Sequence, residues 1–577
     1  MTRPRRSSAA ASLAPAARRA SRVAKNQKVS TTMTSSTRPA DLVVIGGGLG
    51  GVAAALTAAR LGQQVVLTEE YAMLGGQLTS QAVPPDEHPW IESDLASPSY
   101  RALRAGIRDR YRRAYPLTLA AAADPELNPG LGFVSRVCAE PTAGAAVIEE
   151  MLAPLVASGR LEVLLGWRPV AADVDGARVR SVTLRRGADG AERTLEGALF
   201  VDATERGDLL PLTGTEHVVG AESADRTGEL HAPAVADPFD QQAISWCFAV
   251  EYRPGEDHTI DRPAGYASWT EHVDAFWPGP QLSWEDIEPI TLERRTRPMF
   301  AGPTDEPRVE DLWHYRRMLA RTQFAPGFLP HDVSLVNWPQ IDYWRAPLLG
   351  VSPAEQEAAL DGARDLSLSF LHWMQTEAPR HDGGTGYPGL KPRGDLLGSP
   401  DHLAVAPYIR ESRRIEALFT VTEGHIGREM RGEGVAAAQF DDSVGTGYYR
   451  IDLHPSSSGR TYVDIACLPF QIPLGALVPR RMTNLLPANK NIGTTHITNG
   501  AYRLHPVEWS IGEAVGALAV ECRRTGSTPQ ALAASAEGVA DLQRLLGGTL
   551  GVTLRWPREI RDWSPVQDHV ATETAVV

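Results

Sequence analysis

Residues 41 to 51 read DLVVIGGGLGG, and this stretch decides the fold of the chain. The short apolar run at 42–45 is typical of a strand that is buried on both faces of a parallel sheet. The small-residue stretch 52–61 predicts a helix, and 64–68 predicts a second strand. Together these segments predict a strand–helix–strand unit with a glycine-rich turn between its first strand and its helix.

The turn satisfies the pattern GxGxxG with Gly46, Gly48 and Gly51, and it also contains Gly50. The first glycine permits the tight turn, the second lets a pyrophosphate approach the backbone, and the third lets the helix pack closely on the strand. The start of the helix then offers free N–H groups and a partial positive charge. The turn therefore predicts dinucleotide binding; the alternative is a glycine-rich turn without a ligand.

Glu69 ends the second strand, 23 positions after Gly46. A carboxylate at this place accepts hydrogen bonds from a ribose diol. Because it would repel a 2′-phosphate, Glu69 disfavours NADP at this site and leaves FAD or NAD.

Two further segments favour FAD over NAD. Gly75, Gly76 and Gln77 follow the second strand, where a flexible backbone reaches the pyrophosphate or flavin side of the cofactor. Ala203 and Thr204 come directly after a later predicted strand and precede another turn. We therefore expect both segments to contact FAD.

On these stretches, and on residues 469–473 and 484–516, the sequence resembles the glutathione-reductase-type FAD superfamily, and within it the FAD-dependent oxidoreductases. The resemblance extends from residue 41 to about residue 524. It implies an α/β fold whose Rossmann-like FAD-binding domain is built from discontinuous segments, with a mixed α+β substrate domain inserted. One departure is Glu205–Arg206, where many relatives have a Gly-Asp-like turn.

The resemblance also implies that residues 489–516 close back onto the FAD-binding domain. A helix is predicted at 507–522, because apolar residues recur there on one stripe. In such folds the flavin ring lies near the start of this last helix, where the helix dipole stabilises negative charge. The residues in that position are His505, Pro506 and Val507.

The expected domains follow from these segments. Residues 41–215 and 470–526 form the FAD-binding domain, residues 216–469 form the substrate or cap domain, and residues 527–577 form a C-terminal helical segment. Most of the thirteen tryptophans lie in the middle region, where they either fill a core or line a substrate cleft.

Residues 1–40 differ from the rest in composition. They contain arginine and lysine but no acidic residue before Asp41, so we expect a disordered basic tail. Arg5–Arg6 resembles a twin-arginine signal, but the segment after it is too weakly apolar for a signal peptide. A start of translation at Met33 is an alternative.

Composition narrows the partners. The net charge of −13 makes nucleic acid or an anionic membrane surface an improbable main partner. The four cysteines form no CxxC pair and no Cys/His cluster, so we expect no disulfide scaffold, no metal site and a cytoplasmic location. No apolar run is long enough for a membrane span, and the expected partner is a small-molecule substrate.

Three residues are the main catalytic candidates. His505 ranks first because it lies beside the predicted helix start; a capping or packing role is the alternative. His496 ranks second, in a polar segment that precedes the helix. Arg503 is suited to hold an anionic substrate or the O2 side of the flavin, and a structural ion pair is equally consistent.

Tyr408, Arg410 and His88 are weaker candidates for a site role. No second GxGxxG follows a strand and opens a helix, so we expect no separate NAD(P)H domain. The sequence predicts an FAD-dependent oxidase or dehydrogenase that moves a hydride from a small organic substrate to the flavin. An FAD-dependent monooxygenase, a flavoenzyme without net redox change, or a flavin-binding protein with a structural role are the alternatives.

Overall fold

The glycine-rich turn leaves the central strand of the largest sheet. The computed structural model describes residues 39–303, 308 and 311–563. Strand β1 (Ala40–Ile45) lies between β2 (Val65–Glu69) and β6 (Glu192–Asp202), and all three run parallel. Strand β3 (Leu161–Leu165) extends the sheet beyond β2, and β21 (Leu485–Pro487) pairs with β6. Strands from both ends of the sequence thus share one parallel sheet, as the expected α/β fold requires.

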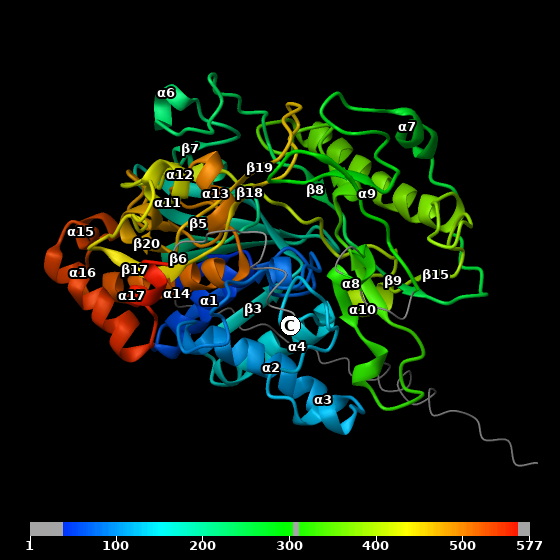
Figure 1. Ribbon diagram of the computed structural model, residues 1–577. Coiled ribbons are helices and arrows are strands. Elements are labelled where there is room, and N and C mark those ends of the chain that lie inside the picture. The colour runs from blue at the N-terminus through cyan, green and yellow to red at the C-terminus, as the bar shows by residue number, and fades with distance from the viewer. Residues whose placement is uncertain (1–38, 304–307, 309–310, 564–577) are drawn as a thin grey trace, which may run out of the picture. The chain divides into compact units, whose positions relative to one another are not determined.

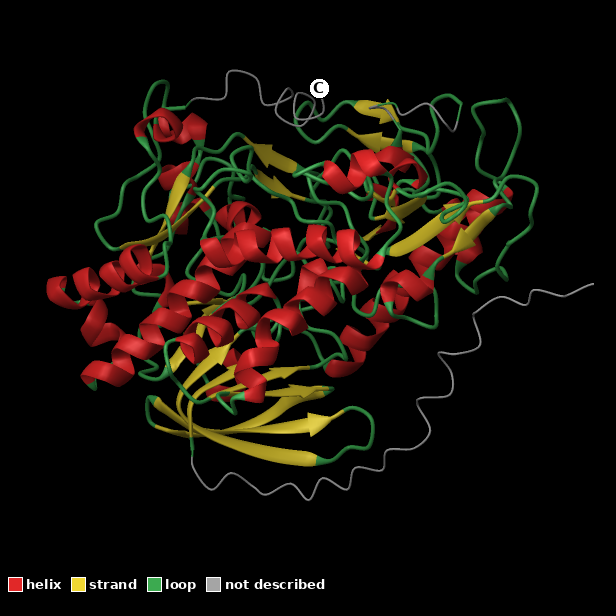
Figure 2. Ribbon diagram, turned by 90° about the horizontal axis from the view of Figure 1, so that it is seen from below, coloured by secondary structure: helices red, strands yellow, loops and turns green. Residues whose placement is uncertain are grey.

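Strand β6 pairs with different strands along its two halves. Its first half pairs antiparallel with β5 (Arg178–Arg186), which pairs in turn with β4 (Trp167–Asp175). Its second half pairs parallel with β1. Figure 2 shows these strands as a yellow layer beneath a layer of helices.

Helices from distant parts of the chain cover the parallel sheet. Helix α1 (Leu49–Arg60) lies beside α14 (His505–Thr525), and α2 (Pro98–Ala114) packs on α4 (Pro141–Ala157), as Figure 1 shows. The first two helices touch through glycines: a Cβ placed at Gly512 would lie 2.2 Å from the carbonyl oxygen of Gly50. Any larger side chain at this position would push the two helices apart.

Residues 216–469 build a second group of elements. Strands β12 (Arg317–Leu319), β13 (Val333–Val336), β9 (Phe248–Tyr252) and β15 (Leu390–Pro392) form an antiparallel sheet. The long helix α9 (Pro353–Thr376) begins with a capping box in which Ser352 and Glu355 bond each other's backbone. The tryptophans of this region, among them Trp338 and Trp373, are buried, which supports the core-filling interpretation.

Shorter elements complete the described chain. Five of them are α13 (His496–Tyr502), β17 (Ser443–Gly447) paired with β20 (Phe470–Pro473), and β18 (Ile451–Leu453) paired with β19 (Val463–Ile465). The C-terminal segment consists of helices α15 (Pro529–Ala533), α16 (Ala536–Gln543) and α17 (Arg558–Arg561) and of a π-helical turn at Arg544–Thr549. The others are α3 (Leu119–Ala123), α5 (Leu209–Thr213), α6 (Ala224–Thr227), α7 (Tyr266–Glu271), α8 (Leu312–Tyr315), α10 (Gly394–Leu397), α11 (Glu423–Ile426), α12 (Arg428–Arg431), β7 (His217–Val218), β8 (Ile244–Ser245), β10 (Glu285–Ile287), β11 (Arg294–Thr296), β14 (Asp342–Tyr343) and β16 (Arg414–Ile415).

The chain divides into Met1–Pro39 and a compact unit, Ala40–Val577. The predicted basic tail and the alternative start at Met33 lie almost wholly outside the described residues. The domain borders near residues 215, 470 and 526 stay predictions.

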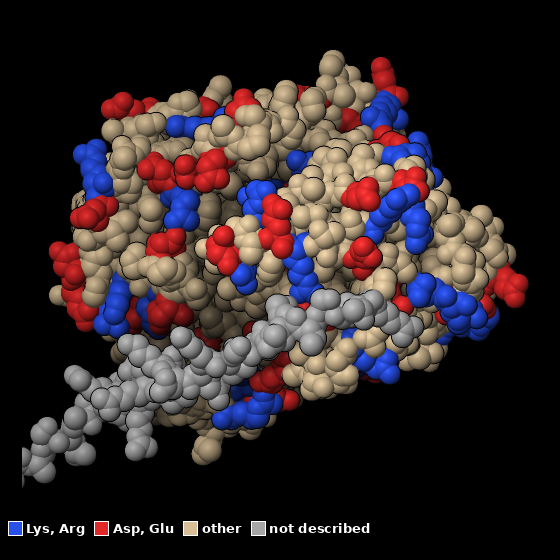
Figure 3. Space-filling model, turned by 180° about the vertical axis from the view of Figure 1, so that it is seen from behind, with Lys and Arg blue, Asp and Glu red and all other residues tan. Residues whose placement is uncertain are grey.

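The length and polarity of the helices and the distribution of surface charge are relevant to the expected partners. Among the described residues, no helix combines the length and the apolar character that crossing a membrane requires. On the face drawn in Figure 3, basic and acidic side chains are interspersed.

Candidate functional site

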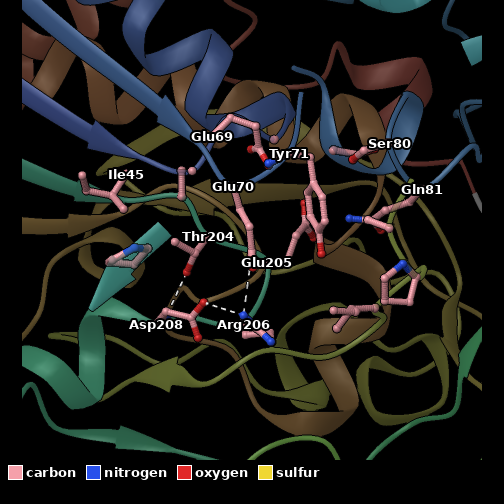
Figure 4. Close-up of a pocket in the computed structure, with 18 of the residues that line it drawn as sticks. Ile45, Glu69, Glu70, Tyr71, Ser80, Gln81, Thr204, Glu205, Arg206 and Asp208 are labelled. Carbon is pink, nitrogen blue, oxygen red and sulfur yellow. Dashed lines mark hydrogen bonds and ion pairs between the residues drawn. The ribbon is translucent and has the colours of Figure 1, made fainter. Parts of the chain in front are cut away.

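A cavity opens where β1, β2 and β6 end. Ligands of open α/β sheets bind at this edge. Figure 4 shows side chains from the ends of these strands and from the segment around Ser80 and Gln81 facing the cavity. The cavity brings together six of the residues predicted to bind the cofactor, namely Gly46, Gly48, Glu69, Gly76, Ala203 and Thr204.

The glycine-rich turn is shaped by close backbone contacts. Gly46 has φ +102°, a conformation that other residues rarely adopt, and a Cβ there would lie 2.2 Å from the oxygen of Ala203. A Cβ at Gly51 would lie 2.0 Å from the oxygen of Gly46, and one at Gly50 would lie 1.8 Å from the oxygen of Ala488. Gly50 and Gly51 therefore serve helix packing and lie outside the cavity lining.

Glu69 ends β2 and lines the cavity. Its carboxylate accepts hydrogen bonds from the backbone N–H groups of Gly47 at 2.7 Å and Tyr71 at 3.0 Å. Burial raises the pKa of Glu69 to about 8, against the lowering effect of these two bonds. Tyr71 and Trp167 line the cavity next to it, so this end offers an acid for ribose hydroxyls together with aromatic side chains.

Three polar side chains form a cradle around Gly48 at the start of α1. A Cβ at Gly48 would meet the carboxylate oxygens of Glu205 and Glu508 at 3.1 Å and the amide nitrogen of Asn489 at 3.2 Å. Lys490 forms an ion pair with Glu205. The other oxygen of Glu205, Oε1, is buried and has no hydrogen-bond partner among the described residues. The cradle thus combines a helix start, a cation and an unsatisfied acid.

Glu508 links the last helix to the first. It accepts hydrogen bonds from the N–H of Gly50 at 2.9 Å and from the Gln77 amide at 2.5 Å. Burial, together with the nearby Glu205, raises the pKa of Glu508 to about 7, against the lowering effect of Lys490 and of the two hydrogen bonds. Sequence reasoning missed this contact because no local pattern relates residues of α14 to the start of α1.

His505 lies at the start of α14 and is fully buried. Its Nδ1 accepts a hydrogen bond from the Asp86 N–H at 3.2 Å, and its Nε2 donates to the Val83 oxygen at 3.2 Å. Burial lowers the pKa of His505 to about 3. The ring therefore holds the segment between Val83 and Asp86, which continues from the cavity residue Gln81.

His496 begins α13 and is also buried. Its Nδ1 donates to Glu411 at 2.8 Å, and its Nε2 accepts from the Arg460 guanidinium at 2.5 Å. Because arginine has no acceptor, Nε2 carries no proton, and both ring nitrogens are in use. Burial opposes ionisation of Glu411, but the contact with His496 outweighs it and holds the pKa of Glu411 at about 2.

Arg503 forms hydrogen bonds through both its side chain and its backbone. It donates to the Tyr408 hydroxyl at 2.6 Å and to Asp452 at 3.1 Å, and its backbone oxygen accepts from Gln77. Its Nε is buried without a partner among the described residues. Tyr408 stands between Pro407 and Ile409, which both line the cavity. The group around Arg503 therefore lies beside a segment that lines the cavity, although Arg503 itself is not among the lining residues.

The remaining predicted residues lie behind the cavity wall. Gly75 has φ +113°, and Gln77 bonds Glu508 and Arg503. Pro506 lines a separate small cavity with His88, and Val507 packs against Gly447. The ring of His88 lies against Trp556, with centroids 5.3 Å apart, which supports a packing role.

These features fit FAD. The Cβ-free space at Gly48, the cation of Lys490 and the start of α1 suit a pyrophosphate. Glu69 suits a ribose diol, and the cavity continues past Gly76 to Ser80 and Gln81, where a flavin ring follows in an extended dinucleotide.

Comparison with known proteins agrees with this fit. The model of the family "FAD dependent oxidoreductase" matches residues 41–546. Over 96 residues the chain is 38% identical to bilirubin reductase of Mediterraneibacter gnavus (strain CC55_001C), covering 17% of this chain and 14% of that protein. Over 91 residues it is 35% identical to NADH oxidase of Thermoanaerobacter brockii, covering 15% and 13%. The chain thus spans only a small part of the length of these relatives.

Solved structures resemble the chain more distantly. OxyS anhydrotetracycline hydroxylase from Streptomyces rimosus is 12% identical, with a TM-score of 0.30 over 93% of this chain and 72% of that one. Glycerol-3-phosphate dehydrogenase from Bacillus halodurans, complexed with FAD, is 15% identical, with a TM-score of 0.22 over 38% and 40%. The family match covers most of the chain, and the chain belongs to the family of FAD-dependent oxidoreductases, with FAD as its cofactor.

Proposed function

We propose that this enzyme is an oxidase or dehydrogenase that takes a hydride from a small organic substrate. The observation that carries the proposal is the single dinucleotide-binding turn. Residues 384–389 also read GxGxxG, but they follow helix α9 and precede β15, so they do not open a helix as phosphate binding requires. With one such turn occupied by FAD, the organic substrate is the natural source of electrons.

The residues along the cavity have different proposed roles. Lys490 and the start of α1 at Gly48 would hold the pyrophosphate, and Glu69 the ribose. FAD, when bound, supplies a two-electron acceptor for the hydride. Gln81 and Ile409 line the cavity beyond the pyrophosphate and would shield the reacting groups from water.

His505, His496 and Arg503 keep distinct proposed roles. All four ring nitrogens of His505 and His496 are already hydrogen-bonded, so neither ring is free to take a proton from a substrate. His505 instead positions the segment that ends at Asp86, and His496 positions Glu411. Arg503, with its unpartnered Nε, remains the candidate that touches the flavin or substrate.

A carboxylate is a better candidate for the proton acceptor. Burial raises the pKa of Asp86, while Arg316 and Arg503 lower it. We therefore propose that the carboxylate of Asp86 takes the proton that leaves the substrate with the hydride.

The test uses FAD-loaded protein in air with panels of small organic compounds, and separately with NADH or NADPH. We expect an organic substrate alone to drive oxygen uptake and peroxide formation if the enzyme is an oxidase, or reduction of an added dye acceptor if it is a dehydrogenase. A monooxygenase would instead consume NAD(P)H and place an atom from labelled O₂ in the product. A protein that does neither, while its FAD stays tightly bound, would indicate a structural role.

A cytoplasmic location also remains a proposal. Cys138, Cys247 and Cys522 are buried as thiols, and burial holds their pKa values well above the usual range, which suits a reducing compartment.

A further inference from the structure

Three arginine–aspartate pairs lie beside the chain segments 80–86 and 406–410, parts of which line the cavity. Two of them are close: Arg503 lies 3.1 Å from Asp452, and Arg410 lies 3.0 Å from Asp342. The third pair, Arg316 and Asp86, is separated by 3.9 Å, beyond hydrogen-bonding distance. Arg316 is therefore the cation of this group whose charge is least satisfied by its own aspartate.

The Arg316 side chain is only 11% exposed, yet its hydrogen-bonding capacity is largely unused. Its Nε and Nη1 are buried and have no hydrogen-bond partner among the described residues. Its guanidinium lies 5.2 Å from the ring centre of Tyr315, which stabilises the charge but satisfies no N–H group. Buried donors without a partner destabilise a fold, so this arrangement is typical of a site that awaits a ligand.

The place of Arg316 in the fold connects it with the cavity. Asp86 ends the short segment that starts at the cavity residue Gln81, and His505 holds this segment from behind. Arg316 also lies close enough to Tyr408 and Tyr449 to interact with them electrostatically. Tyr408 is flanked by two cavity residues, so Arg316 lies close to a segment that forms part of the cavity wall.

The charges and hydrogen-bond donors around Arg316 favour one class of ligand. A guanidinium presents its N–H groups in one plane and matches the two oxygens of a carboxylate. A phosphate dianion is disfavoured because Asp86 and Asp452 contribute negative charge nearby. A neutral ligand would leave the Nε and Nη1 groups of Arg316 without a charged partner at hydrogen-bonding distance.

We propose that Arg316 binds the carboxylate of the organic substrate, so that this enzyme oxidises a small carboxylic acid. This inference rests on the proposed function and names its substrate class. Arg316 is then the residue that selects an acid over the corresponding amide or ester and fixes which carbon faces the flavin.

Binding to the oxidised, FAD-loaded protein tests the inference without turnover. Benzoate and benzamide serve as probes that differ in charge but little in shape, and the change in flavin absorbance reports binding. We expect the parent protein to bind benzoate at least ~10-fold more tightly than benzamide. A parent protein that binds both equally, or whose flavin responds to neither benzoate nor acetate, would overturn the inference.

Two variants locate the anion site. Arg316→Gln should weaken benzoate binding by about 10- to 100-fold and leave FAD affinity unchanged, because one charge-assisted pair is lost. Arg316→Lys keeps the charge without the planar fork, so its affinity for benzoate should lie between those of the parent protein and of Arg316→Gln. Arg262→Gln is the control, since Arg262 also lies over a tyrosine ring, at 4.8 Å, but on the exposed surface.

Three results would contradict the assignment. Unchanged benzoate binding in both Arg316 variants would show that the anion binds elsewhere. An equal loss of FAD affinity would assign Arg316 to the cofactor. An equal loss in Arg262→Gln would show that the effect is not specific. These outcomes do not depend on finding a substrate, so they are distinguishable from failure of the proposed oxidation.

Discussion

Glu508 accepts a hydrogen bond from the backbone N–H of Gly50, although 458 positions separate them in the sequence. Through this bond the last helix occupies one of the N–H groups with which the first helix would bind a phosphate. The start of α1 therefore carries a titratable acid beside the place expected for the pyrophosphate. This relationship makes cofactor binding sensitive to pH.

We predict that FAD affinity falls as the pH rises through about 7, the pKa to which burial raises Glu508. Below this pH the side chain is neutral; above it, a carboxylate faces the pyrophosphate. A bound anion raises the pKa further, so binding takes up a proton and weakens when protons become scarce. Fluorescence titration of the apoprotein with FAD at several pH values measures the slope, and Glu508→Gln should flatten it. A slope that survives this change would contradict the prediction.

Lys490 and Glu205 should affect FAD binding in opposite directions. Glu205→Gln removes a negative charge from the cradle and should tighten FAD binding about tenfold, or ~1.4 kcal/mol. Lys490→Met leaves Glu205 buried without its cation and should weaken binding by a similar factor or more. The double variant should bind nearly as the parent does, which a double-mutant cycle of dissociation constants checks. A change of the FAD dissociation constant in the same direction in both single variants would contradict the roles proposed for Glu205 and Lys490.

Close packing of α1 on α14 should not tolerate even one methyl group. Gly512→Ala would place its Cβ 2.2 Å from the backbone oxygen of Gly50 and should destabilise the fold by about 1–3 kcal/mol. Gly144→Ala is the matched control within a helix, because its nearest neighbour, in Thr79, would lie at 3.4 Å. The control should be neutral or stabilising, since alanine favours helices. Thermal unfolding of both variants gives the comparison, and equal unfolding midpoints would be the contrary result.

His505 should act without titrating. With its pKa lowered to about 3 by burial, the ring stays neutral across the range in which enzymes are assayed. His505→Gln should therefore lower kcat while the pH profile of kcat/KM keeps its shape, whereas Asp86→Asn should remove the acid limb. If His505→Gln removed that limb instead, His505 would be the proton acceptor.

The places of the residues in the local part of the candidate FAD site were predictable from sequence, while their contact with FAD stays a prediction. Gly46, Gly48 and Glu69 lie within one strand–helix–strand unit, where spacing alone fixes their places. The start of α1 was placed three residues late, because the propensity of glycine argues against a helix at Gly50 and Gly51. In the fold these glycines are required by contacts with Gly46 and Ala488.

What the sequence could not predict depends on long-range contacts. Strand β4 was missed because its sequence WRPVAADVD contains proline and two aspartates, which weaken a strand pattern. The pairing of Lys490 with Glu205 joins positions 285 residues apart. Arg316 stood out by no motif; only its buried, unpartnered nitrogens mark it. Composition and periodicity do not carry such information.

The most direct test of the account is a single turnover of the FAD-loaded protein without oxygen. We predict that at least one small carboxylic acid bleaches the flavin stoichiometrically, with one molecule of acid oxidised per flavin, and that neither NADH nor NADPH does so. Rapid bleaching by NADH or NADPH in the absence of any organic substrate would contradict the central claim.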